Sequence, residues 1–191
     1  AKLVRPWYMK LLDEEQTAYA KKRLIRALDN YRWRLGTGFL STPLILYVLA
    51  DMDIEYAYRL LENEEIPGWL SMPKNGATTI WESWEGKTAQ NGVASLNHYS
   101  KGAVVQWLFD TMCGIRMDSE NRFLVAPRPG GHFTRAKAAY NSVYGRVESG
   151  WEKTDGGWMF TVTVPANCTA EVRLPDGSVR EQRPGTAVYR I

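Results

Sequence analysis

The chain has 191 residues, enough for one domain with a proper core or for two small domains. Its 24 Lys and Arg residues and 21 Asp and Glu residues give a formal net charge of +3, too small to suggest binding to nucleic acid or to an anionic membrane. No apolar run approaches the roughly 18–20 residues that a membrane span needs. The two cysteines, Cys113 and Cys168, do not make a disulfide framework or a metal site, and we expect both to be structural thiols.

The first helix is expected over residues 14–28, with Asp13 as its N-cap. Acidic residues in its first turn and basic residues toward its end match the helix dipole. Four residues form a plausible apolar stripe along it, namely Ala18, Leu24, Ile25 and Leu28.

Three further helices are predicted before residue 118. One opens with Thr42 as its cap and Pro43 at its first helical position, and another covers residues 53–63. In the latter, Ile54, Ala57, Tyr58 and Leu61 share one side. The last covers about 95–114, with Ser95 as its expected cap. Between these helices, residues 64–92 form a long segment rich in Pro and Gly, and loops of this length in compact domains are usually functional.

From about residue 121 the pattern becomes alternating, which is typical of strands. Expected strands are 122–127, 133–142, 145–153, 158–165 and 170–175, separated by the turn signals PGG, DGG and PDG. The prediction is an α+β chain, with helices over 1–118 and an antiparallel β-sandwich over 119–191. The mixed apolar faces of the helices favour a portion of a larger helical assembly. A complete small α+β protein remains the alternative.

The stretch GATTIWESWEG carries the strongest chemical signal. Glycoside hydrolysis needs two carboxyl groups that flank the scissile bond. Neighbouring aromatic rings exclude water and offer flat faces to a sugar, and Trp81 and Trp84 lie next to Glu82 in this way. The alternative is that Glu82 pairs with an Arg or caps a helix while the two Trp residues belong to the core. Glu85 is expected to be an exposed loop charge.

His98 is a second candidate, near the start of the expected fourth helix. A neutral imidazole beside a carboxylate can bind a sugar hydroxyl or orient a water molecule, and the flanking Asn97 and Tyr99 can both bind hydroxyls. A hydrogen-bonded histidine in a core is the competing interpretation. His132 is expected to be exposed and inert. No phosphate-binding, dinucleotide-binding or G-x-S-x-G motif is present, and the histidine spacing argues against zinc.

Four stretches together resemble the C-terminal end of bacterial α-L-rhamnosidases of glycoside hydrolase family 78. They are GTGFLSTPLILYVLAD, YAYRLLENEEIPGWLSMPKNGATTIWESWEG, LNHYSKGAVVQWL and FLVAPRPGGHFTRAKAAYNSVYGRV. The resemblance covers nearly the whole chain in the right order. It implies the last portion of an (α/α)6 barrel followed by a C-terminal β-sandwich, and it explains why the helical part looks incomplete.

The resemblance further implies that Glu82 is the general base of an inverting reaction and that His98 belongs to the rhamnose subsite. Trp81 and Trp84 match aromatic positions of the same motif, and Asn97 joins the expected sugar-binding set. Two departures stand out. Ser83 replaces the Arg of the family's W-E-R-W motif, and the upstream Arg-Asp-Glu motif that carries the general acid does not occur here.

We therefore expect the chain alone to be inactive, with no cofactor and no metal in the chemical step. The parent enzyme is expected to release terminal α-L-rhamnose from plant glycosides or polysaccharides. The resemblance favours a periplasmic or cell-envelope location, although the chain lacks an initiator Met and we interpret its start as a cut or processed end. A non-catalytic carbohydrate-binding or interaction module and another (α/α)6 glycosidase are the alternatives. Exposed barrel helices would favour self-association.

Overall fold

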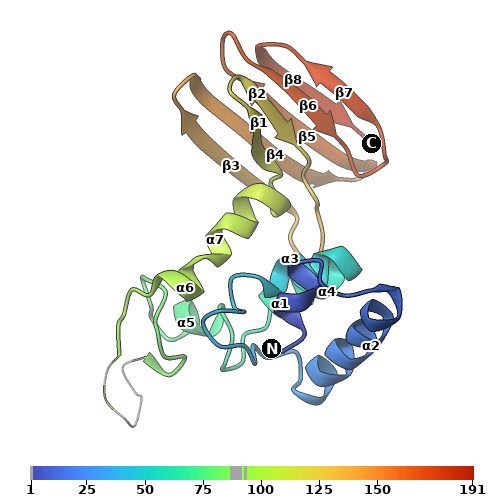
Figure 1. Cartoon of the computed structure of the whole chain (residues 1–191). Coiled ribbons are helices and arrows are strands. Elements are labelled where there is room, and N and C mark those ends of the chain that lie inside the picture. The colour runs from blue at the N-terminus through green and yellow to red at the C-terminus, as the bar shows by residue number, and fades with distance from the viewer. Residues whose placement is uncertain (1, 87–91, 93) are drawn as a thin grey trace. The chain divides into compact units, whose positions relative to one another are not determined.

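The computed structural model describes residues 2–86, 92 and 94–191. The chain divides into two compact units, Ala1–Val104 and Val105–Ile191. We call them the helical unit and the sheet unit. Together they give the mixed α+β composition that the sequence predicts (Figure 1). The predicted domain boundary near Asp118 stays a prediction. Of the expected loop 64–92, residues 87–91 lie outside the described part.

The helical unit contains several short helices and one longer one. In chain order they are α1 Val4–Tyr8, α2 Glu14–Asn30, α3 Ile45–Met52, α4 Ile54–Leu61, α5 Ser71–Lys74 and α6 Tyr99–Gly102. A further turn, α7 Val104–Trp107, follows at the junction of the units, and a π-helical turn covers Leu108–Met112.

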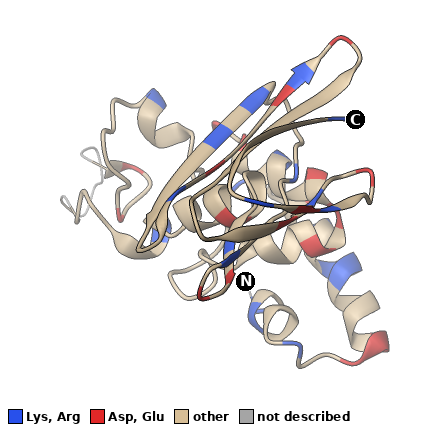
Figure 2. Cartoon of the chain, turned by 90° about the horizontal axis from the view of Figure 1, so that it is seen from above, with Lys and Arg blue, Asp and Glu red and all other residues tan. Residues whose placement is uncertain are grey.

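Helix α2 begins where the sequence predicts. The Asp13 carboxylate accepts the Gln16 backbone N–H at 2.8 Å, and the Gln16 side-chain oxygen accepts the Asp13 N–H at 3.2 Å, which completes a capping box. Figure 2 shows acidic residues at the start of α2 and basic residues further along it, although its last turn contains none. The buried stripe differs from the prediction because Ala20 is buried and Ala18 is exposed. Ala20, Leu24 and Leu28 follow a strict i, i+4 spacing, which places them on one face.

Helix α3 begins at Ile45, so the prediction of Thr42 as its cap and Pro43 as its first residue is wrong. The Thr42 hydroxyl instead lies 2.8 Å from the Thr37 hydroxyl, and the Thr42 N–H donates to the Gly38 carbonyl at 3.0 Å. These bonds keep Thr42 in the preceding turn. Helix α4 forms within the predicted range 53–63, and its buried residues include Ala57, Tyr58 and Leu61 of the predicted side, whereas Ile54 is only half-buried. Asp53 caps the helix.

The expected helix start at Ser95 is also wrong. Helix α6 begins at Tyr99, with an extended His98 as its N-cap residue. The Ser95 hydroxyl accepts the Asn97 N–H at 3.2 Å, and the His98 N–H donates to the Ile80 carbonyl at 2.8 Å. Residues 95–98 therefore use their backbone groups to bind another segment, and these groups are not available for a helix.

The sheet unit holds two four-stranded sheets, which face each other in Figure 1. Their orders are β1-β2-β6-β7 and β3-β4-β5-β8. The strands are β1 Ile115–Ser119, β2 Arg122–Val125, β3 Arg135–Ser142, β4 Gly145–Thr154, β5 Gly157–Val164, β6 Thr169–Arg173, β7 Val179–Gln182 and β8 Gly185–Arg190. Every pairing is antiparallel except that of β2 with β6, which is parallel.

Inward-facing side chains from alternate strand positions build the core of the sheet unit. Phe123, Val147, Phe160 and Val162 are fully buried, which confirms the alternation read from the sequence. Gln182 of one sheet donates to the Val162 carbonyl of the other at 3.0 Å, so a hydrogen bond also links the sheets. The five expected strands all form, whereas β1, β7 and β8 were not predicted.

Both cysteines are buried free thiols, as expected. Burial raises the pKa of Cys113 to about 11 and also raises the pKa of Cys168. Among the described residues, no helix combines the length and the apolar character that crossing a membrane requires.

Candidate active site

Two segments that are separate in the sequence lie alongside each other in the helical unit. The Glu82 N–H donates to the Ser95 carbonyl at 2.8 Å, and the His98 N–H donates to the Ile80 carbonyl at 2.8 Å. The Thr79 hydroxyl also donates to the Leu96 carbonyl. This short ladder brings Glu82 close to the segment that carries Asn97 and His98, the residues that the sequence predicts for one site.

The Glu82 side chain is half-buried and is oriented by the same ladder. Its Oε2 atom accepts the Ser95 backbone N–H at 3.1 Å. A carboxylate has about four acceptor positions, so one backbone donor leaves capacity for a water molecule. Among the described residues, Glu82 forms no ion pair with an arginine, unlike the structural alternative considered for it.

Trp81 is buried at 5% exposure and holds the loop in place. Its backbone N–H donates to the Met72 sulfur at 3.3 Å, and Gly86 packs against its indole ring. A Cβ atom added to Gly86 would come within 2.0 Å of a ring carbon, and the φ angle of Gly86 is +55°. Only glycine meets both conditions without strain. Contact of Trp81 with sugar stays a prediction.

Lys101 is a component of the site that the sequence analysis missed. It is only 4% exposed, and its ammonium group donates to the backbone carbonyl of Glu82. The ammonium nitrogen also lies 3.7 Å from the centroid of the Trp84 ring, a close cation–π contact. Burial lowers the pKa of Lys101 to about 8, and the carboxylates of Glu85 and Glu82 oppose that lowering. The partners of Lys101 are distant in sequence, so no local pattern pointed to it.

The imidazole ring of His98 stacks with two aromatic rings. Its ring centroid lies 4.6 Å from that of Phe39 and 5.2 Å from that of Tyr99, and both pairs are stacked. The Ser100 hydroxyl donates to the Phe39 carbonyl at 2.6 Å and so fixes the Phe39 loop against α6. The Nδ1 atom of His98 is buried and has no hydrogen-bond partner among the described residues. A buried polar atom of this kind needs a ligand or water partner.

The remaining candidates lie as follows. Trp84 is half-buried and meets the ring of Trp69 edge-on, with centroids 6.5 Å apart. Asn97 is exposed beside His98. Glu85 and His132 are exposed, as predicted. No group of three or more His, Cys, Asp or Glu side chains that could hold a metal ion occurs in the part of the chain that the structure describes.

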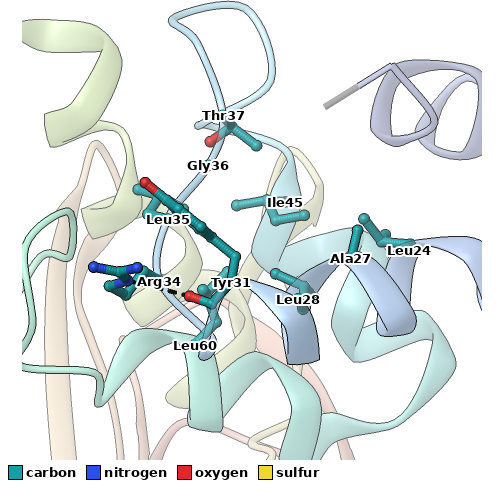
Figure 3. Close-up of a pocket in the computed structure, with 10 residues that line it drawn as sticks. All are labelled: Leu24, Ala27, Leu28, Tyr31, Arg34, Leu35, Gly36, Thr37, Ile45 and Leu60. Atoms are coloured by element: carbon teal, nitrogen blue, oxygen red, sulfur yellow. Dashed lines mark hydrogen bonds between the residues drawn. The ribbon is translucent and has the colours of Figure 1, made fainter.

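A hollow of about 350 Å³ lies elsewhere in the helical unit, between α2, the following loop, α3 and α4 (Figure 3). Its lining is mostly apolar and consists of Leu24, Ala27, Leu28, Tyr31, Arg34, Leu35, Gly36, Thr37, Ile45 and Leu60. The Arg34 guanidinium stacks on the Tyr31 ring at 4.6 Å, and its Nε donates to the Tyr31 carbonyl at 3.2 Å. None of the candidate site residues lines this hollow.

Two parts of the chain match known family models. Residues 1–112 match the bacterial alpha-L-rhamnosidase 6 hairpin glycosidase domain, and residues 121–188 match the bacterial alpha-L-rhamnosidase C-terminal domain. The helical part therefore has the character of a glycosidase domain, and a C-terminal domain of the same family follows it. The chain belongs to the bacterial α-L-rhamnosidase family.

Individual relatives match over most of this chain. It is 36% identical to an α-L-rhamnosidase of Streptomyces avermitilis over 175 residues, which are 87% of this chain and 17% of that protein. It is 38% identical to an α-L-rhamnosidase of Formosa agariphila over 173 residues, which are 86% of this chain and 19% of that protein. The chain thus spans less than a fifth of the length of these curated relatives.

Solved structures of α-L-rhamnosidases also superpose on this chain. The crystal structure of Streptomyces avermitilis α-L-rhamnosidase complexed with L-rhamnose superposes with a TM-score of 0.88 at 32% identity, over 99% of this chain and 21% of that one. Native α-L-rhamnosidase from Aspergillus terreus gives 0.89 at 29% identity, over 99% of this chain and 23% of that one.

Proposed function

We propose that this chain contributes the general base and part of the rhamnose subsite to an inverting α-L-rhamnosidase. In this proposal residues 1–118 are a portion of an (α/α)6 catalytic barrel and residues 119–191 are a C-terminal β-sandwich. The substrate class is terminal α-L-rhamnose on plant glycosides or polysaccharides. The observation that carries the proposal is the ladder between residues 79–82 and 95–98, which brings Glu82 close to the segment of His98.

Glu82 has the chemistry that a general base requires. Its carboxylate is half-buried and is oriented by the Ser95 N–H at 3.1 Å, with acceptor capacity left for a water molecule. In an inverting glycosidase the base activates water on the face of the sugar opposite the leaving group, while a second carboxylic acid protonates the leaving oxygen. We expect that acid outside this chain, because the Arg-Asp-Glu motif is not in the sequence.

His98, Asn97, Trp84 and Trp81 form the proposed sugar-binding set. The Phe39 and Tyr99 rings stack on His98, and its buried Nδ1 has no hydrogen-bond partner among the described residues. Asn97 offers an exposed amide next to it. Trp84 is half-buried beside Lys101, and the buried Trp81 acts by supporting the loop of Glu82.

The first experiment is a calorimetric titration of the 191-residue chain with L-rhamnose, with sedimentation of the same sample to define its assembly state. We expect binding that His98→Ala abolishes and that the matched variant His132→Ala retains, because His132 is exposed in the sheet unit. Binding that survives in His98→Ala would contradict the assignment of His98. Binding confined to the sheet unit would favour the alternative of a non-catalytic carbohydrate-binding module.

The second experiment tests the base in the rhamnosidase that contains this chain. Glu82→Gln should lower kcat by about 10²–10⁴-fold, the usual contribution of general acid–base catalysis, with little change in rhamnose affinity. Glu85→Gln is the matched control and should retain turnover. NMR detection of the first-formed anomer tests inversion, for which β-L-rhamnose is expected. Turnover by Glu82→Gln at the wild-type rate would place the base elsewhere.

A further inference from the structure

The ammonium group of Lys101 has unusual partners for a lysine. It is buried in the helical unit, yet among the described residues it forms no ion pair within 4.0 Å. Its partners are the backbone carbonyl of Glu82 and the face of Trp84, with the ring of Phe39 at 5.9 Å. The charged groups that act on it are the carboxylates of Glu85 and Glu82. The lysine therefore binds the loop mainly through a peptide group and an aromatic ring.

The backbone of Lys101 is held from the opposite direction. The Trp69 indole N–H donates to the Lys101 carbonyl at 3.0 Å, and Trp69 also meets Trp84 edge-on. Lys101 lies in α6 and thus contacts the loop of residues 81–86 through its side chain and Trp69 through its backbone carbonyl. Because α6 follows directly after His98, the same residue connects the two halves of the candidate site.

The two peptide groups that flank the Glu82 α-carbon are both fixed. Its N–H donates to the Ser95 carbonyl at 2.8 Å, and its carbonyl accepts from Lys101. With the backbone of Glu82 fixed in this way, the Ser95 N–H orients its carboxylate through the bond to Oε2. A general base must lie within hydrogen-bond distance of the water it activates, and a displacement of about 1 Å can cost about 10²-fold in rate. The bond from Lys101 is one of the two backbone hydrogen bonds of Glu82 that oppose such a displacement.

We propose that Lys101 is a positioning residue for Glu82: its buried ammonium group holds the Trp81–Gly86 loop through the Glu82 carbonyl and the Trp84 ring. This inference rests on the proposed role of Glu82 as the base. A purely structural side chain at this point would be apolar, because burying a charge carries a desolvation cost that a methionine of similar length avoids. Methionine would avoid that cost but would leave the Glu82 carbonyl without the donor that Lys101 supplies.

Two measurements test the proposal, with Lys101→Met, Lys101→Arg and the matched control Lys74→Met. Lys74 is an exposed lysine of the same unit that pairs with Glu64 at 2.7 Å. In the 191-residue chain, Lys101→Met should speed hydrogen exchange at the amides of Glu82 and Gly86 at least tenfold, whereas the control should not. Thermal unfolding confirms that each variant is folded, and Lys101→Arg, which keeps the charge and a donor, should restore most of the protection.

In the rhamnosidase that contains this chain, Lys101→Met should lower kcat by about 10²-fold with little change in KM. Unchanged amide exchange overturns the proposal, and so does faster exchange with kcat unchanged. Full turnover by Glu82→Gln would instead contradict the proposed role of Glu82 as the base. In that case the exchange data would still show whether Lys101 holds the loop.

Discussion

Replacing Lys101 by Met should remove a pH-dependent gain in the stability of the helical unit. Burial lowers the pKa of Lys101 from 10.5 to about 8 in the folded chain. Between these two values the unfolded chain holds a proton that the folded chain has released, so the free energy of unfolding rises with pH. The contribution of Lys101 is fully present above pH 10.5 and is lost as the pH falls through about 8.

The size of this effect follows from the interval between the two pKa values. At about 1.4 kcal/mol per pH unit, the whole interval corresponds to on the order of 3 kcal/mol. Measurements that stop at pH 9.5 cover the part of the interval above the folded pKa of about 8, which corresponds to about 2 kcal/mol. Methionine carries no charge at any pH, so the stability of Lys101→Met lacks this contribution.

Urea unfolding followed by circular dichroism at a series of pH values from 6.5 to 9.5 provides the assay. The raised pKa values of Cys113, Cys168 and Tyr189 act in the opposite direction, because these groups keep their protons longer in the folded chain. Both proteins share these groups, so the informative quantity is the difference between wild type and Lys101→Met. A difference that stays constant across the pH series would refute the reasoning, and Lys74→Met should follow the wild type throughout.

Three further predictions concern the fold and the assembly. Asp13→Ala removes the capping box of α2 and should cost about 1 kcal/mol in thermal or urea unfolding, whereas an unchanged midpoint would show that the cap contributes nothing. Gly86→Ala should lower the free energy of unfolding by roughly 2 kcal/mol or more and weaken rhamnose binding, because the new Cβ would strike Trp81. The control Gly76→Ala has open space at a φ of +78° and should cost only about 1 kcal/mol. Equal costs for the two variants would contradict the packing argument. Large apolar side chains are exposed in the helical unit, with Leu11, Tyr19 and Leu40 at 69%, 62% and 72% exposure. We therefore expect the chain to self-associate in sedimentation and Tyr19→Glu to weaken that association. A monomer at high protein concentration would contradict this prediction.

Features that depend on neighbours in the sequence were predictable. Asp13 caps α2 through a residue three positions later, and the buried residues of α4 repeat with helical spacing. Strand β5 alternates buried and half-buried positions over its second half, and in β4 the buried Val147 and Ser149 flank the half-buried Glu148, so this period identifies both strands. The strands β1 and β7 were missed because they are short and almost entirely exposed, and β8 was missed because none of its residues is buried. Without one buried face, a strand lacks the alternation that reveals it.

Some features of the candidate site were predictable from the sequence and others were not. The residue types in WESWEG and LNHY, together with the resemblance they carry, were enough to nominate Glu82 and His98 for one site. The extended conformation of residues 95–98 could not be read locally, since these residues have a pattern compatible with a helix start. Their backbone groups bind residues 79–82 instead, and such long-range pairing overrides local helix preference.

The sequence by itself therefore determined the mixed α+β class, the capped helix α2 and the alternating core of the sheet unit, because each depends on residue type and short spacing. Only the tertiary structure decided that α6 begins at Tyr99, that Phe39 stacks on His98 and that Lys101 reaches the Glu82 carbonyl. Each of these contacts joins segments that are far apart along the chain. Their geometry is set by packing and hydrogen bonding across the folded unit, which no local sequence pattern specifies.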